Sequence, residues 1–262
     1  MKIAVLAKQV PDTWSDRRIN LETGRLDRAA SESVPDEINE RALEAALRYK
    51  GANPGTEVIL LSMGPEGTDK SLRKLLAMGA DSAVLVSDEA LAGSDMVQTA
   101  RVLAAGVRRI APDLLLAGNE ATDGRGGMVP AMVAEILGWP VLPGLDEVAI
   151  TDGSVAGTAQ VDGGALRLSA GFPAAASLTE RCAEARFPNF KGIMQAKKKP
   201  MEVLTLAELG IAAGPSAAPV RSEMVSAAAR PAKQAGPKVH DDGTAARQLA
   251  DFLAGLRLAR SS

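Results

Sequence analysis

A glycine-rich stretch between two apolar segments is the first place where this sequence could hold a ligand. Residues 118–127 read Gly-Asn-Glu-Ala-Thr-Asp-Gly-Arg-Gly-Gly, between an expected strand at 114–117 and an expected helix at 128–137. Glycines let backbone N–H groups approach a phosphate, and the first turn of a helix favours an anion. Thr122 and Arg125 could add hydrogen bonds. Neither Gly-x-Gly-x-x-Gly nor a P-loop is present, so a flexible turn explains the same spacing equally well.

A second segment follows the first expected strand. Lys8 and Trp14 come after the apolar run at 3–7 and should emerge at the same sheet edge as the glycine-rich loop. Lys8 is either a ligand contact or a solvated surface lysine. Trp14 either covers a ring or fills a hydrophobic gap.

The third segment, residues 186–200, reads Arg-Phe-Pro-Asn-Phe-Lys-Gly-Ile-Met-Gln-Ala-Lys-Lys-Lys-Pro. Phe187 and Phe190 are two of the four phenylalanines in the chain, and they lie beside a basic cluster. Exposed aromatic side chains rimmed by charge often mark a protein interface. The alternative is that both rings anchor the segment in the core while the lysines form an ordinary solvated face.

The elements that must position these segments follow a regular alternation. Continuous apolar runs typical of buried strands cover residues 3–7, 57–62, 83–86 and 114–117. Helical spacing of apolar residues covers about 36–51, 72–79, 97–107 and 128–137. Such an alternation predicts an α/β fold with a doubly wound, mostly parallel sheet that helices cover on both faces. Residues 19–34 are polar and charged, without clear periodicity.

Beyond Pro140 the pattern changes. Shorter expected strands cover residues 148–150, 154–160, 166–169 and 174–178. Asp152-Gly153 and Asp162-Gly163-Gly164 are hairpin signals, so we expect antiparallel strands here.

The C-terminal part differs in composition. Residues 211–238 are rich in Ala, Pro, Gly and Ser and predict a linker or arm. A last helix over 244–260 carries Leu249, Phe252, Leu253 and Leu256 on one face, and this stripe must be covered by its own domain or by a partner. We therefore expect an α/β domain over 1–210 and a linker with a C-terminal arm over 211–262.

Composition excludes several classes of function. The 262 residues include 30 basic and 32 acidic ones, which argues against a general nucleic-acid binder. A single His240 and a single Cys182 exclude an internal disulfide and leave almost no material for a zinc site or a Ser-His-Asp triad. We expect no metal site, no catalytic residue, no membrane insertion and a cytoplasmic location, since neither a signal peptide nor a long apolar run occurs.

Several ordered motifs together resemble one family. They are Lys8–Asp12, Asp36–Leu47, Ala77–Asp81, the glycine-rich loop, Val161–Gly164 followed by Phe172-Pro173, and Arg186–Lys199. Over about residues 1–210 the chain is similar to the beta (small) subunit of electron-transfer flavoproteins. The version with Phe187–Met194 resembles the actinobacterial branch.

This resemblance implies an adenine-nucleotide alpha-hydrolase-like fold, a structural AMP in this subunit and a partner alpha subunit that holds most of the redox FAD. By resemblance the AMP site comprises Leu6, Ala7, Lys8, Asp36, Ile38, Asn39, Met63, Leu114, Gly118, Asn119, Glu120, Ala121, Thr122, Asp123, Gly124, Arg125, Gly126, Gly127, Met128 and Val129. The stretch from Thr122 to Pro130 is less acidic than in many relatives. A second FAD in place of AMP, as in electron-bifurcating members, therefore stays open.

The resemblance also implies where electrons enter and leave. The flavin of the partner would lie near Asp12 and Thr13. A recognition loop at about 184–200 would dock on acyl-CoA dehydrogenases through Phe187, Phe190, Lys191, Ile193 and Met194. Phe190 stands where relatives place an aliphatic anchor, and Ala185 replaces a common proline. The subunit would be an electron carrier and not an enzyme, serving fatty acid beta-oxidation and passing electrons through a membrane quinone oxidoreductase toward the respiratory chain.

Two other classes of function remain as alternatives. An ATP-hydrolysing or adenylylating enzyme on a similar fold would need a Ser-Gly-Gly-x-Asp-Ser loop or an acidic metal pair, and neither occurs in the sequence. A stress-type nucleotide sensor would form homodimers and fold without another subunit.

Overall fold

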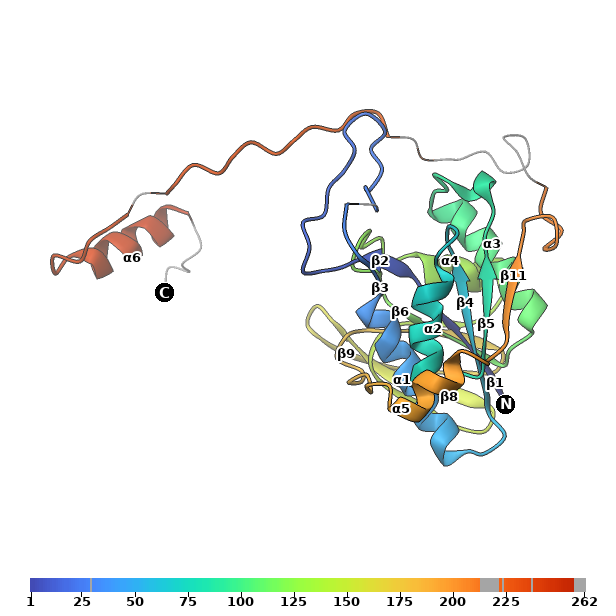
Figure 1. Cartoon of the computed structure of the whole chain (residues 1–262). Coiled ribbons are helices and arrows are strands. Elements are labelled where there is room, and N and C mark those ends of the chain that lie inside the picture. The colour runs from blue at the N-terminus through green and yellow to red at the C-terminus, as the bar shows by residue number, and fades with distance from the viewer. Residues whose placement is uncertain (29, 213–221, 223, 237, 257–262) are drawn as a thin grey trace. The chain divides into compact units, whose positions relative to one another are not determined.

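The computed structural model describes residues 1–28, 30–212, 222, 224–236 and 238–256. The chain divides into two compact units, Met1–Ser226 and Ala227–Ser262. Within the described residues of the first unit, a nine-stranded sheet has the order β11-β5-β4-β1-β6-β10-β7-β8-β9 (Figure 1). Its strands are β1 (Lys2–Leu6), β4 (Glu57–Met63), β5 (Ser82–Val86), β6 (Leu114–Gly118), β7 (Val141–Ile150), β8 (Ser154–Val161), β9 (Gly164–Gly171), β10 (Ala174–Leu178) and β11 (Met201–Leu204).

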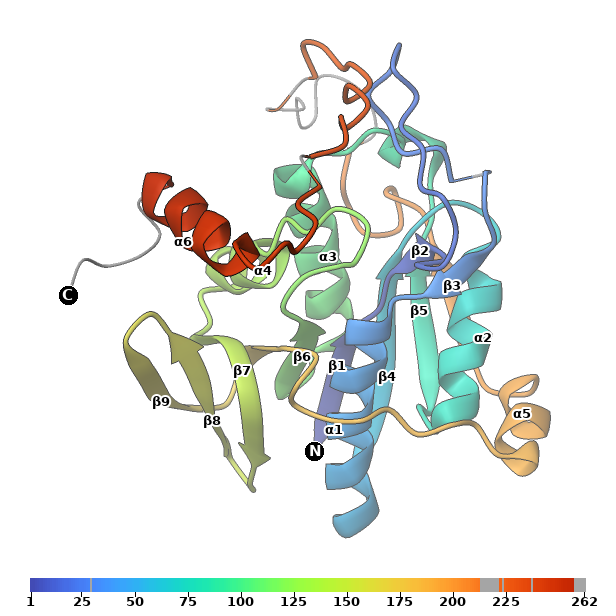
Figure 2. The ribbon, with the colours of Figure 1, turned by 90° about the vertical axis from the view of Figure 1, so that its left-hand side faces the viewer.

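Helices cover both faces of this sheet. They are α1 (Glu37–Ala52), α2 (Asp69–Met78), α3 (Met96–Ile110), α4 (Val129–Leu137) and α5 (Phe190–Ala196), with a 3-10 turn at Glu89–Leu91. Successive residues of a strand point to opposite faces. Accordingly Ile3 and Val5 pack in one cluster with α1 and α2, whereas Ala4 and Leu6 pack in another with α3 and α4. The ribbon in Figure 2 shows the helices arranged around the sheet. The predicted doubly wound α/β fold is confirmed.

The strand order reverses direction between β1 and β6. From β1, the strands β4 and β5 lie on one side, and β6, β10 and β7 lie on the other. The helix α1 packs on one face, and α4, which follows β6, packs on the other. In doubly wound sheets a crevice opens at such a switch point, beyond the carboxyl ends of the strands. The glycine-rich loop follows β6 directly and therefore lies at this switch point, which we call the crevice.

The prediction that 174–178 adds an antiparallel strand was wrong. This strand, β10, lies between β6 and β7 and runs parallel to both. All of its residues are buried, as is typical of a strand covered on both faces. The predicted antiparallel pairs are confirmed for β7 with β8 and for β8 with β9. The strand β7 is longer than expected because its first half pairs with β10 and only its second half pairs with β8.

Four short elements were not predicted from the sequence. The strands β2 (Gln9–Pro11) and β3 (Ser33–Pro35) form a two-stranded antiparallel ribbon that closes off the polar stretch between them. The edge strand β11 pairs in parallel with β5 and buries only Leu204. The helix α5 buries only Ala196. Because these elements bury so few residues, their sequences show no periodic pattern of apolar residues from which they could be predicted.

The second unit contains α6 (Ala245–Gly255), which is shorter than the expected helix; residues 257–262 lie outside the described part. No residue of α6 is buried, and the side chains of its apolar stripe are 37% to 59% exposed. A cover from a partner stays a prediction. Of the expected linker, 213–221, 223 and 237 lie outside the described residues, and the rest has no regular secondary structure. No helix in the described parts combines the length and apolar character needed to cross a membrane.

Candidate functional site

The crevice between β1 and β6 is built around the buried carboxylate of Asp36. One oxygen, Oδ1, accepts hydrogen bonds from the backbone N–H groups of Ile38 (3.0 Å) and Asn39 (3.3 Å) and so caps the start of α1. The other oxygen, Oδ2, accepts from the backbone N–H (2.7 Å) and the hydroxyl (2.8 Å) of Thr122 in the glycine-rich loop. A single side chain therefore fixes both the start of α1 and the middle of the loop.

The ends of β1 and β6 meet α1 at the same point. The Oδ1 of Asn39 accepts a hydrogen bond from the backbone N–H of Lys8 at 2.8 Å. A Cβ added to Gly118 would come within 2.6 Å of Asn39 Nδ2 and 2.9 Å of Ile38 Cγ2. A side chain at position 118 would force the side chains of Asn39 and Ile38 to move, so close packing favours glycine here. The structure thus brings together Lys8, Asp36, Ile38, Asn39 and Gly118, as the sequence analysis expected.

Asp123 ties the loop to basic residues from elsewhere in the chain. Its side chain is 2% exposed and accepts from Lys8 Nζ at 2.8 Å and from Arg28 at 2.9 Å. Burial raises the pKa of Asp123, but the Lys8 ammonium and the Arg28 guanidinium outweigh burial and hold it below the usual range. Lys8 is therefore partly exposed, but its ammonium group pairs with a buried carboxylate.

The sequence analysis missed two arginines at this site. Arg28 pairs with Asp123, and Arg17 donates to the backbone carbonyl and, at 3.2 Å, to the hydroxyl of Thr122. Both belong to the polar stretch between β2 and β3. No signal in that stretch indicated this role, because nothing local in the sequence marks a contact with residues 95 and 105 positions away.

The second half of the loop has an unusual backbone. Arg125 has a φ of 47° and Gly127 a φ of 65°, in the left-handed region that favours glycine. The start of α3 packs closely on Gly126, since an added Cβ would lie 2.7 Å from Met96 Sδ. The first turn of α4 follows at Val129. Such a turn presents backbone N–H groups that have no partner within the helix and that can bind an anion.

Besides Nε of Arg17, two buried oxygen atoms near the carboxyl ends of β4 and β6 have no hydrogen-bond partner among the described residues. They are the hydroxyl oxygen of Ser62, near the carboxyl end of β4, and Oδ1 of Asn119, directly after β6. Buried polar atoms are normally satisfied by protein, water or ligand. Their position at the ends of two strands that flank β1 fits a polar ligand.

The remaining residues of the expected nucleotide site lie in different places. Leu6 and Ala7 are buried at the end of β1, and Met63 is half-buried at the end of β4. Leu114 is fully buried in the core at the start of β6, at the opposite end of that strand from Gly118. The structure therefore does not bring Leu114 to the crevice. The rest of the set follows β6 in one continuous loop, from Asn119 to Val129.

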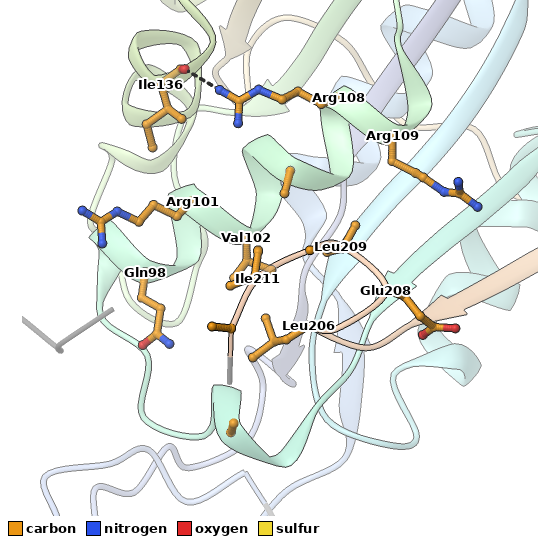
Figure 3. A pocket seen from close by; sticks show the side chains of 14 residues that line it. Gln98, Arg101, Val102, Arg108, Arg109, Ile136, Leu206, Glu208, Leu209 and Ile211 are labelled. Carbon is orange, nitrogen blue, oxygen red and sulfur yellow. Dashed lines mark hydrogen bonds between the residues drawn. The ribbon is translucent and has the colours of Figure 1, made fainter. Parts of the chain in front are cut away.

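The larger cavity lies elsewhere, along the outer face of α3. It measures about 690 Å³ and lies between α3 and residues 206–212, and its lining includes Val102, Leu206 and Ile211 (Figure 3). Arg108 at its rim donates to the Ile136 carbonyl at 2.8 Å. The cavity has no buried carboxylates and no converging donors comparable to those of the crevice. Size alone therefore does not make it the candidate site.

The segment expected to contact partner proteins is anchored on α2. Arg73 donates to the carbonyls of Ala196 (2.6 Å) and Lys199 (2.7 Å). The Lys199 ammonium donates to the carbonyls of Leu76 (2.9 Å) and Ala80 (2.5 Å) at the end of α2, and burial lowers its pKa. Lys199 therefore stabilises the fold, and the exposed lysines of the segment are Lys191, Lys197 and Lys198.

The interpretation of Phe187 and Phe190 as core anchors was wrong. Their exposed fractions are 93% and 81%, and those of Ile193 and Met194 are 48% and 52%. In α5 the buried residue is instead Ala196. We call the four exposed side chains, Phe187, Phe190, Ile193 and Met194, the apolar patch. It is bordered by exposed lysines, as many protein interfaces are.

The two residues expected near a flavin lie at the end of β2. Asp12 is half-buried and its Oδ1 accepts from the backbone N–H of Trp14 at 3.0 Å, whereas Thr13 is exposed. Trp14 is 95% exposed and covers no gap in this chain. Among the described residues, no three His, Cys, Asp or Glu side chains are grouped so that they could hold a metal ion.

Comparison with known proteins agrees with this geometry. The family described as "Electron transfer flavoprotein domain" matches residues 23–209. The chain is 46% identical over 262 residues to "Electron transfer flavoprotein subunit beta" of Mycobacterium tuberculosis, covering 98% of each chain, and 44% identical to that of Mycobacterium leprae, also over 98% of each. It is 36% identical to "Caffeyl-CoA reductase-Etf complex subunit CarD" of Acetobacterium woodii, over 97% of this chain and 96% of that protein. The chain therefore belongs to the electron transfer flavoprotein family, as one of its beta subunits.

Proposed function

We propose that this beta subunit binds AMP in the crevice between β1 and β6 and pairs with an alpha subunit that holds the FAD. The observation that carries the proposal is the convergence of Asp36, Lys8 and Arg28 on Thr122 and Asp123 of the glycine-rich loop, at the switch point of the sheet. Together these groups fix a loop whose second half leads into the first turn of α4. A phosphate monoester would be held there by backbone N–H groups.

The polar atoms beside the crevice support a nucleotide rather than an apolar ligand. Ser62 Oγ and Asn119 Oδ1, which lack partners among the described residues, offer hydrogen bonds to the ribose or adenine. The ends of β1 and β6 pack tightly on α1. A dinucleotide, which is longer than AMP, would therefore have to extend along the glycine-rich loop. We therefore assign AMP, and a second FAD in this crevice is the alternative outcome of the test.

The FAD, when held by the alpha subunit near Asp12 and Thr13, supplies the electron-accepting chemistry. This chain supplies none of its own: its residues bind the nucleotide, orient the loop and dock partner proteins. The subunit is in this proposal an electron carrier in the cytoplasm and not an enzyme.

The apolar patch supports transient docking on acyl-CoA dehydrogenases. The ring of Phe190 is 81% exposed. Its burial against a partner would remove a large apolar surface from water and so stabilise the complex. Lys191, Lys197 and Lys198 surround it and would steer an acidic surface toward it. Electrons would then pass to a membrane quinone oxidoreductase and toward the respiratory chain, in the oxidation of fatty acids.

The test is reduction of the purified heterodimer. With an acyl-CoA dehydrogenase and its substrate, the flavin absorbance of the heterodimer should bleach, and each component alone should leave it unchanged. A reconstituted pair of subunits that takes up no FAD would overturn the proposal. So would a flavin that no acyl-CoA dehydrogenase reduces.

A further inference from the structure

A buried carboxylate on α1 lies next to the segment that carries the apolar patch. The side chain of Glu44 is 6% exposed, although it is charged. It pairs with Arg48 one turn further along α1, at 2.9 Å. Its main partner comes from a distant part of the chain: Arg186 Nε lies 2.6 Å from Oε2, and a second guanidinium nitrogen lies 3.1 Å from Oε1. Such a bidentate pair fixes direction as well as distance.

The contact extends over several residues on both sides. The backbone N–H of Arg186 also points at Glu44 Oε2, at 3.4 Å. Arg41, three residues before Glu44 on α1, donates to the Ala183 carbonyl at 2.8 Å, and Arg48 reaches the Glu184 carbonyl at 3.5 Å. Residues 183–186 are therefore held along one stripe of α1. The exposed ring of Phe187 follows immediately.

The other end of the segment is fixed independently. Arg73 and Lys199 hold α5 and the residues after it on α2, as described above. A Cβ added to Gly192 would lie 2.3 Å from the Ala77 carbonyl oxygen, so α5 lies directly on the end of α2. The apolar patch thus lies between two anchor points, and only the first depends on a buried ion pair. Fixing a binding segment before it meets its partner reduces the ordering cost of association.

We infer that Glu44 is a positioning residue for partner docking, acting through Arg186 to hold Phe187 and Phe190 in the orientation that the dehydrogenase meets. This inference rests on the proposed function. Glu44 is buried, and its ion-pair partners are Arg48 and Arg186, neither of which belongs to the crevice or the apolar patch. Its substitution should therefore weaken docking while the flavin content and the rate of electron transfer within the docked complex stay the same.

The experiment compares three variants in the complete heterodimer. Glu44→Gln removes the buried charge. Arg186→Lys keeps the charge but loses the bidentate fork, and because this side chain is 44% exposed we expect the variant to disturb the fold less than Glu44→Gln does. Glu180→Gln is the control, because it makes the same charge change at an exposed residue outside the segment. The readouts are FAD content, kcat and KM for the heterodimer as electron acceptor, and hydrogen exchange of residues 183–195.

We expect KM to rise about tenfold for Glu44→Gln and about threefold for Arg186→Lys, with kcat within about twofold. Exchange of 183–195 should accelerate in both variants and stay unchanged in the control. An unchanged KM in both variants, whether or not exchange accelerates, would overturn the inference. A fall in kcat at constant KM would also overturn it. If dehydrogenases reduce no form of the heterodimer, including the unsubstituted one, the proposed function itself fails.

Discussion

The carboxylate of Asp36 and the residue Thr122 are joined by two hydrogen bonds, one to the backbone N–H at 2.7 Å and one to the hydroxyl at 2.8 Å. The two residues are separated by 86 positions in the chain. Because the other oxygen of Asp36 caps α1, this contact couples the stability of a core helix to the shape of the glycine-rich loop. The crevice proposed to bind the nucleotide is therefore part of the fold and not an addition to it.

Replacing Asp36 by alanine should destabilise the protein and release the nucleotide. The change removes a helix cap, which costs about 0.5–2 kcal/mol, and leaves buried donors of Thr122 unsatisfied, at about 1–3 kcal/mol. Urea unfolding should show a loss of about 2–4 kcal/mol, and the purified variant should retain less AMP. Thr122→Ser keeps both bonds and serves as the control. A variant that loses stability but keeps full AMP would show that the loop does not need this contact.

Alanine at Gly118 should separate α1 from the end of β6. The added Cβ would lie 2.6 Å from Asn39 Nδ2, and overpacking of this kind costs about 1–3 kcal/mol. Gly51→Ala is the matched control, since Gly51 lies in α1 with nothing within 4 Å of the added Cβ. It should stabilise the helix by about 0.5–1 kcal/mol. Equal midpoints of thermal unfolding for the two variants would contradict the close packing described here.

The protein should lose stability in acid because of two buried carboxylates. Lys8 and Arg28 hold the pKa of Asp123 below its usual range, and Arg186 and Arg48 do the same for Glu44, in both cases against the opposing effect of burial. A carboxylate whose pKa is lowered on folding contributes stability above its unfolded pKa. That contribution is lost as the pH falls through the folded value.

The free energy of unfolding should therefore fall as the pH drops below about 4. Asp123→Asn lacks one of these groups and should show a shallower fall, measured by urea unfolding at successive pH values. If Asp123→Asn loses as much stability as the unsubstituted protein over the same range, the ion pairs of Asp123 do not contribute.

Truncation of Phe190 should weaken docking without affecting the fold. The ring is 81% exposed, so Phe190→Ala should change the free energy of unfolding by less than about 0.5 kcal/mol. The KM of the heterodimer with its dehydrogenase should rise about tenfold, as for other interface anchors. Val203→Ala removes a side chain that is 55% exposed on β11 and should leave KM unchanged. Equal KM values for the two variants would remove Phe190 from the interface.

The sequence predicted those parts of the fold that have a strong apolar pattern. The runs of β1, β4 and β6 are buried on both faces, and the Asp-Gly dipeptides mark the two hairpins of β7–β9. By contrast, no local pattern in the sequence shows which strands lie next to each other in the sheet. The alanine-rich β10 was therefore assigned to the antiparallel part, although burial on both faces suits a parallel one.

Of the residues that meet at the candidate site, several were expected from the sequence, but Arg17, Arg28 and the contacts themselves were not. Asp36, Thr122 and Asp123 were all expected at the nucleotide, yet their pairing with one another and with Arg28 depends on how distant segments meet. Glu44 belonged to a recognised helix motif, but only the fold shows that it holds Arg186. Long-range polar pairs of this kind leave no periodicity in a single sequence.

The most direct test of the account is the identity of the nucleotides released by denaturation, measured by mass spectrometry for this chain alone and for the reconstituted heterodimer. We predict AMP in equimolar amount with this chain in both samples, and FAD only when the alpha subunit is present. FAD in place of AMP in the crevice, or no nucleotide bound to this chain, would contradict it.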